Sequence, residues 1–551
     1  MESAKKVLKW LGIFFLIIVG ATIILFICLN IIPGMTLFGY RMSKSGSSNW
    51  ITKNYVISDT PEDIVIITET FDIEIIENQS TNILTVSYYD NTSGLVTLDY
   101  SQLKYKQDDN LVVIEMLEKE GWIFGSGKVK LEIPESLNVS LNINSTSGDI
   151  SINKELINNL TIDTESGSFT WKAENITYVP KGTNSNSLRT DLSGEQPTDD
   201  DINNDNTNND DNTSSDDNSD VNEDNNDQNT PEAEPEYEKV VTPIKDVSIN
   251  SLNIFTDNAS VDLSCFENID IHDQLLIKAS KLKLNLKNLS GKITIDSTDL
   301  EFSASNISNE ENSIKINSRK GVITIGTIEG SGNASFVTEE SNITITNAYC
   351  NIHTSTNEGN TRIDNAFGNI IAYSAAGGIS INKAWSDVQT TTDSGDISIS
   401  EYYKNAYITT NTGNFTGHSK SEESTEIKTI ITQKNGNITL VNENNSVEIN
   451  CENACNVNVT FRNMPLNKLF RHTISNTKGD NKISILVTRN PFKFRAVGDN
   501  VYGELAENVK ISSNKEYIDY LPNNYESDGP LVDVTRLNIE GKNIRFIGLY
   551  E

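Results

Sequence analysis

Apolar and polar residues alternate in short runs along most of the chain from residue 55 onward. The period of two is clear in residues 71–75 and 84–87, and clusters of Asn, Asp, Gly and Ser separate the runs. Such alternation is typical of β-strands that bury one face, and these polar residues are typical of the turns between strands. No amphipathic helical pattern interrupts the runs, so the sequence predicts an all-β fold.

A repeat of 18 residues organises the stretch from 341 to 417. This interval separates four turn glycines, Gly359, Gly377, Gly395 and Gly413, and four aromatic residues, Tyr349, Phe367, Trp385 and Tyr403. A repeat of this size is typical of a solenoid, in which one coil cannot bury its own apolar face and therefore stacks on the next. We expect a parallel β-solenoid of about 18 to 20 residues per coil.

The coil from 377 to 394 illustrates the expected arrangement. Gly377 and Gly378 would permit the positive φ of a tight turn, because glycine has no Cβ. Ile379 and Ile381 are expected to point inward from one strand, and Val388 from the next. The residues between them would then face solvent.

The aromatic residues at the 18-residue interval have two interpretations. They form either a stacked, buried or half-buried corner of the solenoid, or an exposed strip that binds sugars by stacking. The exposure of Tyr349, Phe367, Trp385 and Tyr403 distinguishes the two, and these four are the candidate binding residues.

The N-terminal region predicts a membrane anchor. Residues 11–32 are almost entirely apolar, which is long enough for a helix to cross a bilayer. Lys5, Lys6 and Lys9 precede this run, so residues 1–10 are expected in the cytoplasm and the C-terminal bulk outside the cell. A cleaved signal peptide is the alternative, although no small-residue cleavage site follows. Residues 33–54 would form a juxtamembrane stalk.

The segment 181–239 is rich in Asn, Asp, Ser and Thr. It contains too few apolar residues to offset the entropy of ordering, so we expect a disordered acidic insert. Calcium binding is the alternative, but the spacing of an EF-hand loop is absent. With 77 acidic and 44 basic residues, the chain has a formal charge of −33, which disfavours nucleic-acid binding.

The rest of the chain divides into three β regions. Residues 55–180 contain the N-terminal β region and the first coils, and residues 240–463 contain the main solenoid repeats. Residues 464–551 contain more prolines and are expected to form a β cap, because a solenoid must cover the apolar face of its last coil.

The spacing of the cysteines and histidines matches no cofactor-binding motif, so we expect no cofactor. A disulfide between Cys451 and Cys455 is conceivable in an oxidising compartment, but four cysteines beyond the anchor are no disulfide framework. The Cys-x3-Cys pair has no nearby histidine, so the sequence predicts no zinc site and no other metal.

Short sequence motifs in the repeats suggest that the chain resembles a known family. Ser-Gly-Asp-Ile-Ser-Ile occurs at 147–152 and 394–399, and Leu-Glu-Ile-Pro at 131–134 and Ile-Glu-Ile at 73–75 precede its first copy. These phrases resemble a bacterial adhesin family that is catalogued as a domain of unknown function. The resemblance spans roughly residues 60–500 apart from the acidic insert. It implies a membrane-tethered β-solenoid at the cell surface, and it brings no catalytic residues.

These observations favour a binding function over catalysis. We expect a surface-binding protein or adhesin whose partners are cell-wall glycans, host glycans or surface proteins. An envelope-stress sensor or cell-envelope scaffold is the main alternative. A polysaccharide-active enzyme is disfavoured, because acids in the repeat columns are single and interspersed with amides. Rows of Thr on successive coils suggest ice binding as a further hypothesis, but Thr is common in β-strands for reasons unrelated to ice.

Overall fold

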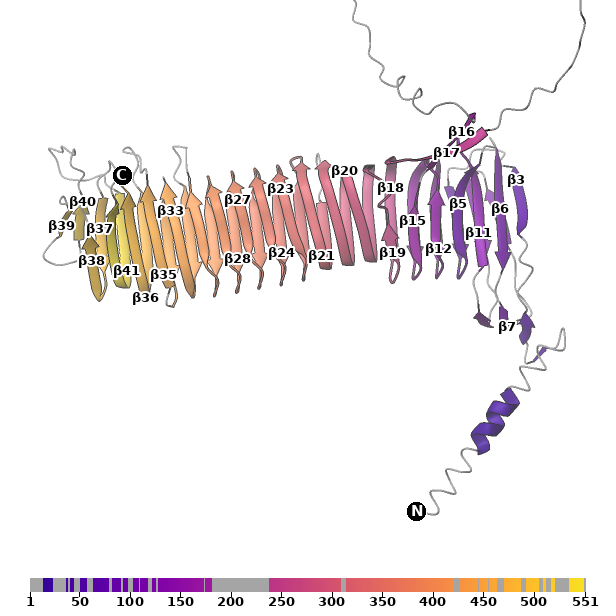
Figure 1. Ribbon diagram of the computed structural model, residues 1–551, viewed down its shortest axis with the longest axis horizontal. Helices are drawn as coiled ribbons and strands as arrows, with labels where there is room; N and C mark the ends of the chain where they lie inside the picture. The colour runs from indigo at the N-terminus through magenta and orange to yellow at the C-terminus, as the bar shows by residue number, and fades with distance from the viewer. Residues whose placement is uncertain are drawn as a thin grey trace, which may run out of the picture. The chain divides into compact units, whose positions relative to one another are not determined.

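The computed structural model describes the chain in segments (Figure 1). The described residues are 13–22, 36–37, 40–43, 50–56, 63–78, 82–90, 93–97, 103–108, 110–116, 121–124, 127–172, 174–180, 237–308, 314–420, 427–443, 445–453, 455–462, 470–486, 492–504, 509–511, 517–520 and 535–549. They form two units, Met1–Ala173 with Ile244–Glu551, and Glu174–Pro243. In the smaller unit, β16 (Glu174–Pro180) and β17 (Tyr237–Pro243) form an antiparallel pair. Of the predicted disordered insert, residues 181–236 lie outside the described residues, whereas residues 237–239 belong to β17 and are therefore ordered, contrary to the prediction.

The predicted anchor is described only at residues 13–22, which are helical. Apolar side chains of this segment, among them Phe15 and Leu16, are exposed. Within the described part of the chain, no helix has the length and apolar character needed to cross a membrane. The remainder of residues 11–32 lies outside the described residues.

The larger unit is a parallel β-solenoid, as the sequence predicts (Figure 1). Two ladders of parallel strands run through it, and each coil contributes strands to both. The first ladder contains β12 (Val139–Ser145), β14 (Ile157–Thr164), β18 (Asp246–Thr256), β22 (Asn333–Thr338), β24 (Asn351–Thr356), β26 (Ile370–Ser374), β28 (Val388–Thr392), β30 (Ala406–Thr410), β32 (Lys428–Gln433) and β34 (Ser446–Cys451).

The second ladder alternates with the first along the chain. It contains β13 (Ile150–Asn153), β15 (Ser168–Trp171), β19 (Ser260–Asp262), β23 (Asn342–Ala348), β25 (Thr361–Ala366), β27 (Ile379–Ala384), β29 (Ile397–Tyr402), β31 (Phe415–Ser419), β33 (Gly436–Glu443) and β35 (Cys455–Arg462). Three long strands take part in both ladders, namely β20 (Asn268–Ser308), β21 (Ile314–Glu329) and β36 (Arg471–Leu486).

The coils are less uniform than the repeat suggests. There are about 12 turns, with about 21 residues per turn on average. Within the repeat, partners are 18 residues apart, as for Ile381 and Ile399. Just beyond it, Phe415 pairs with Ile438, 23 residues later. The expected 18 to 20 residues therefore hold in the repeat, whereas the coil that directly follows it is longer.

Columns of inward-pointing residues form the core. Ile345, Ile363, Ile381 and Ile399 pair in register, and each has no exposed surface. Val388 is also buried, as the alternation predicts. Burying one such aliphatic side chain contributes about 1.5–3 kcal/mol, and a column repeats this gain in every coil.

The N-terminal end of the solenoid is covered by antiparallel strands. The covering strands are β3 (Ile51–Val56), β6 (Ile83–Asp90) and β8 (Leu103–Asp108), next to the parallel strands β4 (Asp63–Thr68), β5 (Asp72–Asn78), β9 (Leu111–Met116) and β11 (Gly127–Pro134). Tyr55 on β3 stacks on Tyr105 on β8, with ring centroids 3.6 Å apart. This contact joins the edge strands of the two ladders. A separate small sheet contains β1 (Thr36–Leu37), β2 (Tyr40–Ser43), β7 (Ser93–Thr97) and β10 (Gly121–Phe124).

The C-terminal end has an inserted strand. The strands here are β37 (Phe492–Val497), β38 (Asn500–Glu504), β39 (Val509–Ile511), β40 (Tyr517–Tyr520) and β41 (Thr535–Leu549). Although β41 comes last in sequence, it pairs in parallel with β36 on one edge and with β37 and β38 on the other. The antiparallel strands β40 and β39 then continue from β37. The chain therefore places its last strand inside the stack rather than at its end.

The turn glycines serve close packing rather than positive φ. Gly377 is not among the glycines with positive φ, which contradicts the expected turn conformation. A Cβ on Gly377 would instead lie 1.9 Å from the carbonyl oxygen of Gly359 in the preceding coil. The same clash, at 1.9–2.0 Å, would occur at Gly359, Gly395 and Gly413. Successive coils thus approach too closely at this corner for any side chain.

Two adjacent glycines allow a matched test of this packing. We expect Gly377→Ala to lower the free energy of unfolding by about 1–3 kcal/mol or more, because backbone must move to admit the methyl group. Gly378→Ala is the control, since its Cβ would meet its nearest atoms at 3.5 Å, and we expect a change within about 1 kcal/mol. Thermal and urea denaturation followed by circular dichroism would measure both, and equal effects would contradict the explanation.

Candidate functional site

The four aromatic residues of the repeat form one continuous row. Tyr349, Phe367, Trp385 and Tyr403 each follow a strand of the second ladder, at the corner before the next strand. Their rings are parallel within 2–4°, with centroids 4.6, 6.3 and 4.2 Å apart along the row. Two of these distances are close to the spacing of neighbouring β-strands, so each coil places one ring against the next.

The row is exposed rather than buried. Tyr349, Phe367 and Trp385 retain 51%, 42% and 40% of their surface, and Tyr403 is half-buried. The expected stacked corner is therefore present; Tyr403 is half-buried as expected, whereas the other three rings are more exposed than expected. Because the rings cover one another, the row presents mainly ring edges to solvent, and a sugar cannot lie flat on each ring as a stacking strip would require.

The backbone holds the row in place. The amide of Phe367 donates to the carbonyl oxygen of Ala348 (2.8 Å), and that of Trp385 donates to Ala366 (2.8 Å). The amide of Tyr403 repeats the pattern with Ala384 (2.9 Å). These hydrogen bonds join consecutive coils immediately beside the rings, so the row has little backbone freedom to lose when a ligand binds.

Hydrogen-bonding side chains flank the row on the side of the first ladder. Asn351, Asn369, Asp387 and Asn405 occupy the position two residues after each ring. The Oδ1 atom of each accepts a hydrogen bond from the backbone amide in the following coil, at 3.0 Å for Asn351, 3.3 Å for Asn369 and 3.1 Å for Asp387. This amide ladder is polar, regular and parallel to the row.

The other flank is polar and becomes charged toward Tyr403. Asn365 donates through Nδ2 to Oδ1 of Asn347 at 2.9 Å, and Lys383 and Glu401 continue the same column. Glu401 accepts hydrogen bonds from Lys420 and from the hydroxyl of Tyr403 (3.0 Å). The bond from Lys420, more than the others, lowers the pKa of the Glu401 carboxyl. The row therefore ends beside a carboxylate that is held ionised.

Two exposed apolar residues near the row were not anticipated. Ile371 and Tyr407 point outward from the first ladder, 47% and 43% exposed. They share a column with His353 and Gln389, which lies two residues beyond the amide ladder. The 18-residue interval already places them in register, so their exposure could have been predicted from the outward-facing positions of the repeat.

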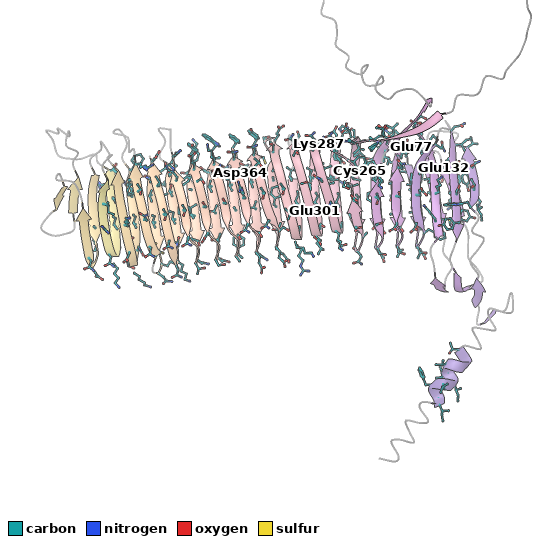
Figure 2. All side chains as sticks on the ribbon, viewed as in Figure 1. Glu77, Glu132, Cys265, Lys287, Glu301 and Asp364 are labelled. Carbon is teal, nitrogen blue, oxygen red and sulfur yellow. The ribbon has the colours of Figure 1, made fainter. Side chains whose placement is uncertain are left out.

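Figure 2 shows that charged side chains such as Asp364 also stand on the outer surface, and Asp364 accepts a hydrogen bond from Arg362 (3.0 Å).

A separate groove of about 710 Å³ lies near the C-terminal end. Among its lining residues, Asn458, Lys482 and Arg545 pair in register on β35, β36 and β41. Asp480 lines it as well and accepts a hydrogen bond from Asn543 (2.5 Å). The groove is thus polar and carries charges of both signs, whereas the aromatic row is an apolar ridge.

Lys154 is a buried charged group with a structural role. Lys154 is fully buried, and its Nζ donates to the carbonyl oxygens of Pro134 (3.2 Å) and Glu135 (3.3 Å). Burial lowers the pKa of Lys154, although Glu77 at 3.7 Å opposes this effect. No group of three or more His, Cys, Asp and Glu residues in the described segments is arranged to hold a metal ion.

Comparisons with known proteins give no further guide to the site. No family model, no curated protein and no solved structure matches this chain. The fold and the arrangement of side chains are therefore the basis for any functional conclusion.

His472 is a buried titratable group near the C-terminal end. It is 1% exposed and packs against Phe461, with ring centroids 4.6 Å apart. Neither ring nitrogen has a hydrogen-bond partner among the described atoms. Burial lowers its pKa from 6.5 to about 3, so the folded protein keeps this histidine neutral at physiological pH.

This histidine makes stability depend on pH. The unfolded chain binds a proton at His472 below about pH 6.5, whereas the folded chain does so only near pH 3. Above about pH 6.5 this histidine is neutral in both states and does not affect the free energy of unfolding. As pH falls from there toward 3, only the unfolded chain gains the proton, and the free energy of unfolding decreases, by about 2 kcal/mol at about pH 5.

We expect His472→Leu to flatten the acid side of the stability profile, measured as melting temperature against pH. His353→Leu is the control, because His353 is exposed and should leave the profile unchanged. If wild type and His472→Leu lost the same number of degrees in melting temperature between neutral and acid pH, other groups would be the cause of the acid sensitivity.

Proposed function

We propose that the protein is a membrane-anchored extracytoplasmic β-solenoid that acts as a surface-binding protein of the adhesin type. The observation that carries this proposal is the row of Tyr349, Phe367, Trp385 and Tyr403, in which the first three large aromatic rings are exposed and the fourth is half-buried. Exposed aromatic clusters rimmed by polar groups mark interaction sites, because solvent exposure of such surface is otherwise unfavourable.

The composition of the row fits a binding site. Tyr and Trp are enriched among the residues that dominate binding energy, and Tyr, Trp and Phe are enriched at interfaces. The stacked rings and the hydrogen bonds beside them hold the row ready before a ligand arrives, which reduces the entropic cost of binding. The scaffold therefore presents a preorganised apolar surface.

The shape of the site favours an extended ligand. The rings follow one another coil by coil, and the amide ladder of Asn351, Asn369, Asp387 and Asn405 runs beside them. A linear polymer lying along the row would place apolar C–H groups against the ring edges and polar groups against the flanks. Cell-wall or host glycans have this combination of surfaces, and extended segments of surface proteins are the alternative ligands.

The location is part of the same proposal. Residues 11–32 are long and apolar enough for a single transmembrane helix, and three lysines precede them. The short N-terminus would lie in the cytoplasm and the solenoid outside the cell. The resemblance to the bacterial adhesin family supports the same location and role.

The proposal is tested with full-length protein in lipid nanodiscs, offered to immobilised cell-wall polysaccharide and to host-matrix glycans and proteins. We expect Trp385→Ala to weaken binding about 10- to 100-fold, the loss typical of a residue that contributes about 1.4–2.8 kcal/mol. Phe367→Ala should have the same direction of effect. Trp50→Ala is the matched control, since it removes an exposed tryptophan directly before β3, at the N-terminal end of the solenoid and away from the row.

The outcomes separate the two functional classes. Equal binding by wild type and by the row variants would remove the row from the site. Failure of wild type to bind any of these ligands, combined with altered envelope-stress resistance but normal attachment in cells lacking the protein, would replace adhesion with a sensor or scaffold role.

A further inference from the structure

Cys451 and Cys455 occupy a corner that other coils close by a hydrogen bond across the turn. At this corner, the amide of Gly359 donates to Oγ1 of Thr356 (2.9 Å), and that of Gly413 donates to Oγ1 of Thr410 (3.0 Å). In another coil, Oγ1 of Thr392 donates to the carbonyl oxygen of Gly395 (2.7 Å). We call each such pair of positions the corner clasp.

The register assigns the two cysteines to the clasp of a later coil. Gln433 and Gly436 continue the two columns, and they pair with Cys451 and Cys455 respectively. The threonine position is thus occupied by Cys451 and the glycine position by Cys455. Both side chains point into the corner, 8% and 0% exposed.

The clasp geometry suits a disulfide. A Cβ placed on Gly359 would lie 2.8 Å from Oγ1 of Thr356, and one on Gly413 would lie 3.1 Å from Oγ1 of Thr410. On Gly436 the corresponding Cβ would lie 2.7 Å from Nε2 of Gln433. In a disulfide, each Cβ lies about 3 Å from the partner sulfur, so the two columns already provide the required approach.

The two thiols also interact with each other, which distinguishes them from the other cysteines of the described chain. The Cys451 and Cys455 side chains are hydrogen-bond partners, and this contact raises the pKa of Cys451 and lowers that of Cys455. The Cys455 thiol also donates to the carbonyl oxygen of Gln433 (3.7 Å). Cys265, labelled in Figure 2, donates to the carbonyl oxygen of Trp171 (2.6 Å), and its pKa is affected by no other cysteine. Burial raises the pKa of Cys265 and of Cys350 to about 11, so both are poor nucleophiles.

We propose that Cys451 and Cys455 are a disulfide site that covalently closes the corner clasp of this coil. The oxidant is a small-molecule disulfide or a thiol–disulfide oxidoreductase. One thiolate attacks the oxidant disulfide and releases a thiolate, and the second thiolate then attacks the mixed disulfide and releases the other. The two cysteines lose two protons and two electrons, and the oxidant is reduced to two thiols. The chemistry of this site is independent of what the aromatic row binds.

The experiment uses the full-length protein in nanodiscs, treated with oxidised glutathione and then unfolded in the presence of an alkylating reagent. We expect alkylation of Cys451 and Cys455 to fall from complete to absent, with the peptide that carries both lighter by two hydrogens. Cys265 and Cys350 serve as internal controls and should remain fully alkylated. Full alkylation of the pair after oxidation, or linkage of either cysteine to a different one, would overturn the proposal.

A double variant, Cys451→Thr with Cys455→Gly, restores the clasp of the other coils without thiols. We expect oxidised wild type to melt at a higher temperature than reduced wild type, whereas this variant should melt at one temperature in both conditions. Equal melting of oxidised and reduced wild type would overturn the role of the bond in closing the corner. Neither result depends on glycan binding, so failure of the adhesion proposal remains distinguishable.

Discussion

The structure depends on backbone hydrogen bonds between equivalent residues of successive coils. These bonds place every residue of a coil about one strand spacing from its counterpart in the next. Each position along the coil therefore becomes a column. Buried columns repeat one residue type or a close substitute, whereas an outward column can vary, as His353, Ile371, Gln389 and Tyr407 show. Isoleucine columns inside, asparagine ladders at the corners and the aromatic row outside are consequences of that one constraint.

The same constraint explains the glycine column. At the corner of Gly359, Gly377, Gly395 and Gly413, a Cβ would lie within about 2 Å of the preceding carbonyl. Glycine is needed there because the coils touch, and the backbone conformation does not require it. Where the column reaches Cys455, the threonine partner becomes Cys451, and a hydrogen-bonded corner is replaced by a pair of thiols.

The aromatic row shows how regular architecture creates a binding surface. A ring at one corner is an ordinary exposed side chain, but repetition at the strand spacing aligns four of them into a ridge with parallel polar flanks. A longer coil follows the repeat, and the residue after Tyr403 in the same column is Lys420, whose amide donates to the carbonyl oxygen of Tyr402 (2.8 Å). The ridge is thereby limited to the strictly periodic coils.

The sequence by itself determined the all-β class, the 18-residue interval and the inward positions of Ile379, Ile381 and Val388, because period and alternation directly reflect burial in a strand. It also identified the four aromatic residues as one column. Their exposure was decided only by the tertiary structure, since a corner residue follows neither a period of two nor a period of 3.6, and its direction depends on how the chain turns. The reason for the glycines and the place of β41 inside the stack were likewise decided there, because both depend on contacts between segments whose distance in sequence does not specify their distance in space.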